Sequence, residues 1–228
     1  MLHYETVPVT PFQQNCSIVW CDATKAAAII DPGGNLNLLL DAVKQLGVTL
    51  KQIWITHGHI DHAGGAAELR EKLGVTIEGP HEADKFLLDN LPQSGARYGM
   101  LGIREVTPDR WLKDGDTVEG PGWHFTAVHT PGHTSNHICF GLREHKALFT
   151  GDHVMGWSTS VIAPPDGERR WDMNWPPFVR VQAEDLDGHG HNTYILSPLV
   201  RGQTAWLPFH VVRATGFTFA HATSEGGT

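Results

Sequence analysis

The stretch "THGHIDH", residues 56–62, restricts the possible folds of this 228-residue chain more than any other feature. It directly follows an apolar run and directly precedes a segment rich in alanine and glycine. Within it, four residues can bind a metal: His57, His59, Asp61 and His62. At a strand end, the first two can direct their imidazoles toward one point while the other two face a second point, and paired metals typically lie about 3.5–4 Å apart. Core histidines are usually solitary, so the cluster predicts a metal site between a strand and a helix.

Two downstream loops offer further ligands. "HTPGHTSNH" places His133 on a Pro-Gly turn, and "LFTGDH" places Asp152 at another strand end. Loops at strand ends are where α/β folds gather their functional residues. We therefore expect both residues to join the cluster, and we expect the neighbouring His129, His137 and His153 to be bystanders.

The hydrophobic pattern indicates a single α/β domain over residues 1–228, with layers built on mixed sheets. Asn35 is suited to cap the first helix. Helices are predicted at residues 35–47, 63–74 and 81–91. Strands are predicted at residues 14–21, 25–30, 50–56, 75–79, 116–120, 123–132, 136–142 and 146–153.

Composition limits the partners and the location of the chain. The formal net charge of −8 argues against nucleic acid held by bulk electrostatics. No apolar run approaches the length of about 18 residues that a membrane-spanning helix needs, and no signal peptide is evident at the start. Three cysteines, Cys16, Cys21 and Cys139, cannot all pair within the chain and fit reduced thiols. We expect a cytoplasmic protein with no membrane partner.

The last third of the chain has a different composition. No lysine follows Lys146, and no sustained helical period is present after residue 167. A frameshifted or recombined C-terminus over residues 168–228 would explain the change. Translating the gene in its other two frames after codon 167 tests this hypothesis, which predicts an amphipathic helix and a Pro-Gly-His-Gly turn in one of them.

The three motifs "THGHIDHAGG", "HTPGHTSNH" and "LFTGDH", in this order, resemble the HxHxDH…H…D pattern of the metallo-β-lactamase superfamily. Within it, "VTPFQQNCSIVWCDATKAAAIIDPGG" and "TPDRWLKDGDTV" are similar to the small glyoxalase II-like (hydroxyacylglutathione hydrolase-like) enzymes. Residues 151–167 resemble the lactamase-β-2-like branch instead. The resemblance implies an αββα sandwich with metals at one edge of its two sheets, recognisable over residues 1–167.

The resemblance also implies a ligand set. The first metal would be held by His57, His59 and His133. The second would be held by Asp61 and His62, and Asp152 would bridge the two metals. Asp31 resembles the family's buried aspartate behind the ligands. The last metal histidine is expected at His189, in "DLDGHGHNTY", with His191 and His210 as alternatives.

Such a site predicts a hydrolase with two divalent metal ions. We expect both to be zinc, with iron or manganese as alternatives. The metals would activate hydroxide, with Asp61 as ligand and orienting residue. Thioester hydrolysis on a small-molecule acyl substrate is the leading interpretation. A lactonase, a β-lactamase-like enzyme and an RNA phosphodiesterase of the same fold remain open. So do a mononuclear iron persulfide dioxygenase and a metal-binding protein with an impaired second site.

Overall fold

The computed structural model describes residues 2–120, 122–145 and 147–153, together with the backbone of three short strands further on. The first sheet has the order β1-β2-β3-β4-β5. Its strands are β1 (Leu2–Val9), β2 (Gln14–Cys21), β3 (Ala26–Ile30), β4 (Thr49–Trp54) and β5 (Thr76–Glu78). The first three strands are antiparallel, and the pairs β3–β4 and β4–β5 are parallel. The carboxyl ends of β3, β4 and β5 therefore meet at one edge of the sheet.

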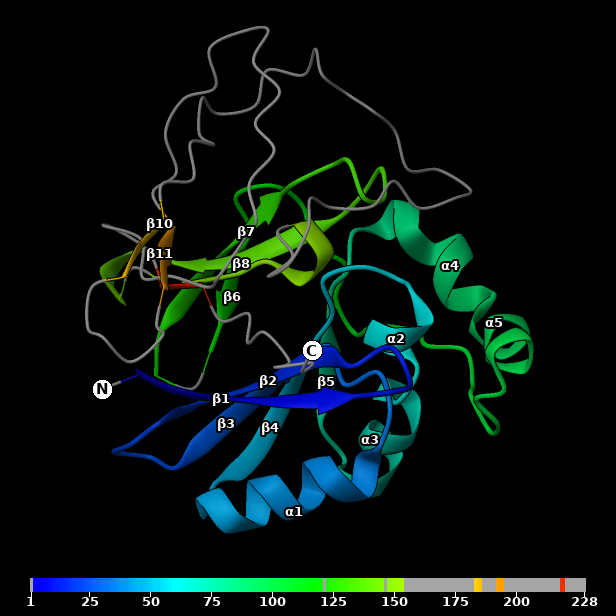
Figure 1. Cartoon of the computed structure of the whole chain (residues 1–228), viewed down its shortest axis with the longest axis horizontal. Helices are drawn as coiled ribbons and strands as arrows, with labels where there is room; N and C mark the ends of the chain where they lie inside the picture. Colours follow the sequence, from blue (N-terminus) through cyan, green and yellow to red (C-terminus); the bar gives the residue numbers. More distant parts are fainter. Residues whose placement is uncertain are drawn as a thin grey trace, which may run out of the picture.

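The second sheet has the order β12-β9-β8-β7-β6 and lies across the first (Figure 1). It contains β6 (Thr117–Glu119), β7 (His124–His129), β8 (Ile138–Leu142), β9 (Ala147–Phe149) and β12 (Thr218–Phe219). Two further strands, β10 (Ala183–Asp185) and β11 (Asn192–Tyr194), pair with each other.

Two helices cover the outer face of the first sheet (Figure 1), α1 (Leu36–Leu46) and α3 (Ala66–Leu73). Helix α1 ends at Gly47, whose backbone φ of 64° lets its N–H donate back to the carbonyl of Lys44. Three further helices are α2 (Ile60–Ala63), which lies within the candidate metal-binding motif, α4 (Lys85–Asp89) and α5 (Leu91–Tyr98). Single turns of 3-10 helix occur at Glu82–Asp84, Arg143–His145 and Gly151–His153.

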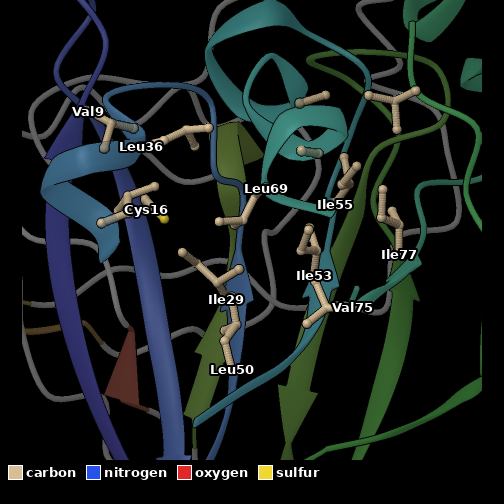
Figure 2. Close-up of a cluster of buried hydrophobic side chains, with 14 of the residues drawn as sticks. Val9, Cys16, Ile29, Leu36, Leu50, Ile53, Ile55, Leu69, Val75 and Ile77 are labelled. Atoms are coloured by element: carbon tan, nitrogen blue, oxygen red, sulfur yellow. The ribbon is translucent and has the colours of Figure 1, made fainter. Parts of the chain in front are cut away.

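The hydrophobic core has two parts. One lies between the first sheet and its helices, where Ile29 and Ile53 meet Leu36 and Leu69 (Figure 2). The other lies between the two sheets and centres on Trp54. The Trp54 ring lies 4.8 Å from that of Phe125 and 5.4 Å from that of Phe140, measured between centroids, and none of the three is exposed. Because Trp54 ends β4, this second core fixes the start of the metal-binding motif.

The described layers are helix, sheet and sheet, which agrees with the expected αββα sandwich. The helical layer expected on the second sheet falls on residues outside the described ranges, as do His189, His191 and His210. The single-domain prediction for residues 1–228 and the proposed break after residue 167 also concern that part of the chain and stay predictions.

Several expected elements differ in detail. Asn35 does begin α1, but its side chain makes no capping bond; instead its Oδ1 accepts the Thr10 N–H at 2.6 Å. The long helix expected at residues 63–74 begins at Ala66, and a separate turn, α2, forms within the motif itself. The segment expected to be helical at residues 81–91 contains a 3-10 turn and α4 before α5 continues the chain.

Cys16, Cys21 and Cys139 are free thiols, each buried, as expected from their number and positions. Among the described residues, no helix has the length and apolar character needed to cross a membrane.

Candidate metal centre

The motif residues gather where the two sheets meet. Asp31 and Thr56 follow the neighbouring strands β3 and β4, and the Asp31 N–H donates to the carbonyl of Trp54 at 2.9 Å. The second sheet joins at the same point, since the Ile138 N–H at the start of β8 donates to the Thr56 carbonyl at 3.0 Å. Candidate ligands from both sheets are thus held by hydrogen bonds to the backbone of residues 54–56.

Three imidazoles converge in a first group, His57, His59 and His133. His57 Nε2 lies 2.9 Å from His59 Nδ1, and His133 Nε2 lies 3.0 Å from the same atom. Two ligand atoms of a tetrahedral zinc at about 2.0–2.1 Å would be about 3.3 Å apart. The three nitrogen atoms are therefore spaced closely enough to share one metal ion.

A second group contains His57, His62 and Asp152, so His57 belongs to both groups. His62 Nε2 lies 3.2 Å from Asp152 Oδ1 and 3.6 Å from Asp61 Oδ2. The other oxygen of Asp152 lies 3.4 Å from His133 Nε2. The Asp152 carboxylate thus contacts both groups, as a bridging ligand must.

Asp31 lies behind the ligands and determines which ring nitrogen of His57 carries the proton. It is 2% exposed, its Oδ1 accepts the Thr56 N–H at 2.8 Å, and its Oδ2 accepts the Thr56 hydroxyl at 2.7 Å. The Thr56 hydroxyl has then used its proton, so at 3.0 Å it accepts from His57 Nδ1. His57 Nε2 keeps a lone pair, and that lone pair faces the first group.

The same aspartate orients His62. Its Oδ2 accepts the Nδ1–H of His62 at 2.9 Å, which leaves Nε2 as the atom that faces Asp152 and Asp61. His62 Nε2 is buried, and the atom opposite it is Asp152 Oδ1. A lone pair opposed to a carboxylate oxygen at 3.2 Å repels it, so a cation or a proton has to lie between them. The donor set therefore fits a second metal ion.

The pKa shifts of the metal-free chain agree with this arrangement. Burial, reinforced by neighbouring histidines, lowers the pKa of His57 well below its usual value and that of His59 to about 3. Burial also disfavours charge on His62, but Asp152, Asp61 and Asp31 outweigh it and raise its pKa. Two of the candidate ligand histidines are thus kept neutral, as metal binding requires, while the carboxylates around His62 favour a cationic charge at that position.

We expect acid to destabilise the metal-free protein. Burial lowers the pKa of His57 and His137 well below 6.5, and the pKa values of His59 and His153 to about 3. The unfolded chain takes up protons at about pH 6.5, so His59 and His153 each cost about 1.4 kcal/mol of stability per pH unit as the pH falls from there toward 3. His57 and His137 act in the same direction. His62, with its raised pKa, contributes stability that is present below pH 6.5 and is lost as the pH rises through its folded-state pKa.

The free energy of unfolding should therefore be highest near pH 6.5 and fall toward pH 4. Urea unfolding of chelator-treated protein at several pH values measures this. A stability that stays constant or rises between pH 6.5 and 4.5 would contradict the neutral, buried state of these histidines.

Three residues that support the candidate ligands or the loop between them were not predicted as functional. Thr56 orients His57, Asp84 fixes the loop between the first two histidines, and His137, which was expected to be a bystander, contacts the backbone of Asp152. Only Thr56 has a local signal, its position directly before the motif. His129 and His153 belong to neither ligand group in the described part of the chain.

Asp84 and Gly58 set the geometry of the His57–His59 loop. The fully buried Asp84 accepts the Gly58 N–H at 2.9 Å with Oδ2. A Cβ at Gly58 would lie 2.6 Å from Leu87 Cβ, 3.2 Å from the Asp84 carbonyl oxygen and 3.4 Å from Leu88 N. Only a glycine lets the loop pack this closely against α4.

Gly58→Ala is accordingly expected to displace the loop and lower zinc affinity by about 10-fold or more, the range seen when the support of a ligand is lost. Gly141→Ala is the matched control, because its Cβ would meet nothing nearer than 3.5 Å. Competition with a chromogenic chelator measures both affinities. Equal zinc affinity in the two variants would show that the close approach at Gly58 has no role.

Comparison with known proteins agrees with the geometry. The sequence profile of the Metallo-beta-lactamase superfamily matches residues 9–197. A curated relative from Haemophilus influenzae, named hydroxyacylglutathione hydrolase GloC, is 45% identical over 152 residues, which cover 66% of this chain and 71% of that relative. A hydroxyacylglutathione hydrolase from Bdellovibrio bacteriovorus is 34% identical over 68% of this chain, which spans 53% of that protein's length.

Solved structures show the same fold. The B3 metallo-beta-lactamase BLEG-1 superposes with a TM-score of 0.65 at 26% identity, covering 73% of this chain and 79% of that one. TTHA1623, solved in a di-iron-bound form, superposes with a TM-score of 0.63 at 28% identity, covering 72% and 79%. With its HxHxDH loop between strand and helix and its two-sheet sandwich, this chain belongs to the metallo-beta-lactamase superfamily.

Proposed function

We propose that the chain is a dinuclear metal-dependent thioester hydrolase of the hydroxyacylglutathione hydrolase type, acting on a small-molecule acyl substrate. The observation that carries the proposal is the position of Asp152, whose two oxygens lie 3.2 Å from His62 Nε2 and 3.4 Å from His133 Nε2. The name of the Haemophilus relative supports the substrate class.

In this proposal the described residues hold two metal ions, which we expect to be zinc. The ligands are His57, His59 and His133 for the first metal, Asp61 and His62 for the second, and Asp152 for both. His189 remains the candidate for the last histidine and lies outside the described residues. Asp31 keeps its role behind the ligands, through His62 and through Thr56.

When bound, two divalent metals lower the pKa of a water molecule toward neutrality and polarise the carbonyl oxygen under attack. The chain's own residues position the two ligand groups and the attacking water. Asp152 fixes the spacing of the two groups, and Asp61, at the start of α2, would orient the attacking water as well as ligate. Asp31 keeps the ring of His62 in the orientation that leaves Nε2 facing the site.

Metal analysis followed by a substrate panel tests the proposal. The panel contains S-lactoylglutathione, an acyl-homoserine lactone, a chromogenic cephalosporin and a phosphodiester. We expect turnover of the thioester, its loss after treatment with a chelator and its recovery on addition of zinc. Removal of the metals should leave far-UV circular dichroism near its starting value, because the described core does not depend on the ligands.

The other outcomes discriminate between the alternatives. Turnover of the lactone, the cephalosporin or the phosphodiester alone would contradict the thioesterase assignment and leave a metallo-hydrolase of another class. One iron per chain and no hydrolysis would favour a persulfide dioxygenase. One metal per chain with no activity would favour a binding protein with an impaired second site.

A further inference from the structure

His137 lies beneath the ligands and uses both of its ring nitrogens. The side chain is fully buried and directly precedes β8. Its Nε2 accepts the backbone N–H of Asp152 at 3.2 Å. A backbone N–H can only donate, so this Nε2 is unprotonated and Nδ1 carries the proton, which it donates to the Thr130 hydroxyl at 3.0 Å.

The backbone of His137 is fixed on both sides. Its carbonyl accepts the Thr130 N–H at 2.8 Å, and the next residue, Ile138, donates to the Thr56 carbonyl at 3.0 Å. The ring is therefore held between the loop that carries His133 and the strand end that carries His57. The centroid of its ring lies 4.8 Å from that of His57.

The turn before Asp152 lies directly on this ring. Gly151 has a φ of +47°, and a Cβ there would come within 2.7 Å of His137 Nε2 and 2.6 Å of Thr56 Oγ1. His137 thus holds the Asp152 backbone through a hydrogen bond and the preceding residue, Gly151, through packing. Both contacts position the Asp152 carboxylate, which reaches both ligand groups.

We propose that His137 is a positioning residue, which holds the Asp152 carboxylate between the two metal positions without binding a metal itself. Ligation by His137 would require its Nε2 lone pair to leave the Asp152 N–H, and the Nδ1 proton faces Thr130. This inference rests on the two-metal site of the proposed function. His137 thereby becomes the fifth histidine of the site, and its role differs from the proposed metal ligation by His57, His59, His62 and His133.

Two substitutions separate the contacts of the ring. In His137→Asn, the shorter amide can reach Thr130, as Nδ1 does, but leaves the Asp152 N–H without an acceptor. In His137→Gln, the amide oxygen lies near the position of Nε2 and can accept that N–H. Exposed His124, which pairs with Glu119, provides the matched control as His124→Asn.

The readout is zinc binding by the full chain, measured as the stepwise affinities in competition with a chromogenic chelator. Loss of a partner behind a metal ligand typically costs 10–100-fold in affinity. We expect His137→Asn to lose about 10-fold or more at the weaker site and about 3-fold or less at the tighter one. His137→Gln and His124→Asn should bind both zinc ions as the wild type does.

Three results would overturn the inference. The first is wild-type affinity at both sites in His137→Asn. The second is a loss of affinity at the weaker site in His137→Gln as large as the loss in His137→Asn. The third is an equal loss at both sites together with a lower melting temperature of the metal-free protein, which indicates a merely structural role. Thioester turnover is scored separately: two bound zinc ions without turnover in the wild type contradict the proposed function and leave this result standing.

Discussion

Replacing Asp152 with alanine is expected to reduce kcat/KM for the thioester by about 10³-fold or more, because several kcal/mol of transition-state stabilisation depend on the metals and about 4 kcal/mol corresponds to that factor. Asp152 is the residue that contacts both ligand groups, with His62 on one side and His133 on the other. Its loss should remove the shared ligand and leave two like-charged metal positions without a bridge.

Steady-state kinetics on purified Asp152→Ala measures the effect, with zinc content determined on the same sample. His59→Ala, which removes a ligand of the first group, should lose activity to a similar extent. The matched control is Asp41→Ala on the exposed face of α1, which should keep kcat/KM within about 2-fold, as expected for a surface change with no special contacts. Substantial turnover in both Asp152→Ala and His59→Ala would rule out the proposed centre.

Trp54→Ala should have the largest effect on stability, a loss of about 3–5 kcal/mol in the free energy of unfolding. The indole is fully buried between the two sheets and packs on Phe125 and Phe140. Alanine would leave a cavity at the end of β4, two residues before Thr56. For a domain of this size the melting temperature should fall by about 10 °C.

Chemical denaturation of the zinc-loaded and metal-free proteins measures this loss. Trp54→Phe should keep most of the stability, since it retains an aromatic ring and removes an indole N–H that is buried without a partner among the described residues. Leu101→Ala is the surface control, because Leu101 is 88% exposed, and should change stability by about 0.5 kcal/mol or less. An effect of Trp54→Ala no larger than that of the control would mean that the inter-sheet core is not packed as described.

The cluster of histidines and aspartates could be predicted because its chemistry is local. His57 and His59 are two positions apart on an extended segment, so their meeting needs no knowledge of the fold. His133 directly follows one predicted strand and Asp152 lies at the end of another, and strand ends of a layered fold converge. Asp31 could be singled out only by its resemblance to the family's buried aspartate, and its contacts with Thr56 and His62 appear only in three dimensions.

The supporting residues could not be predicted because their partners are distant in sequence. Asp84 contacts a glycine 26 positions earlier, and His137 contacts the backbone of a residue 15 positions later. Neither contact leaves a pattern in the chain. Two elements, β1 and α5, were also not predicted. The first half of β1 shows no alternation of buried and exposed residues, and Pro92 and Gly95 weaken the helical pattern of α5.

The stoichiometry of bound metal distinguishes a dinuclear centre from a mononuclear one. Protein purified in the presence of zinc and then dialysed free of excess metal should contain two metal ions per chain by elemental analysis, and His62→Ala should reduce the content to one. A wild-type content of one ion per chain, unchanged in His62→Ala, would contradict the dinuclear centre.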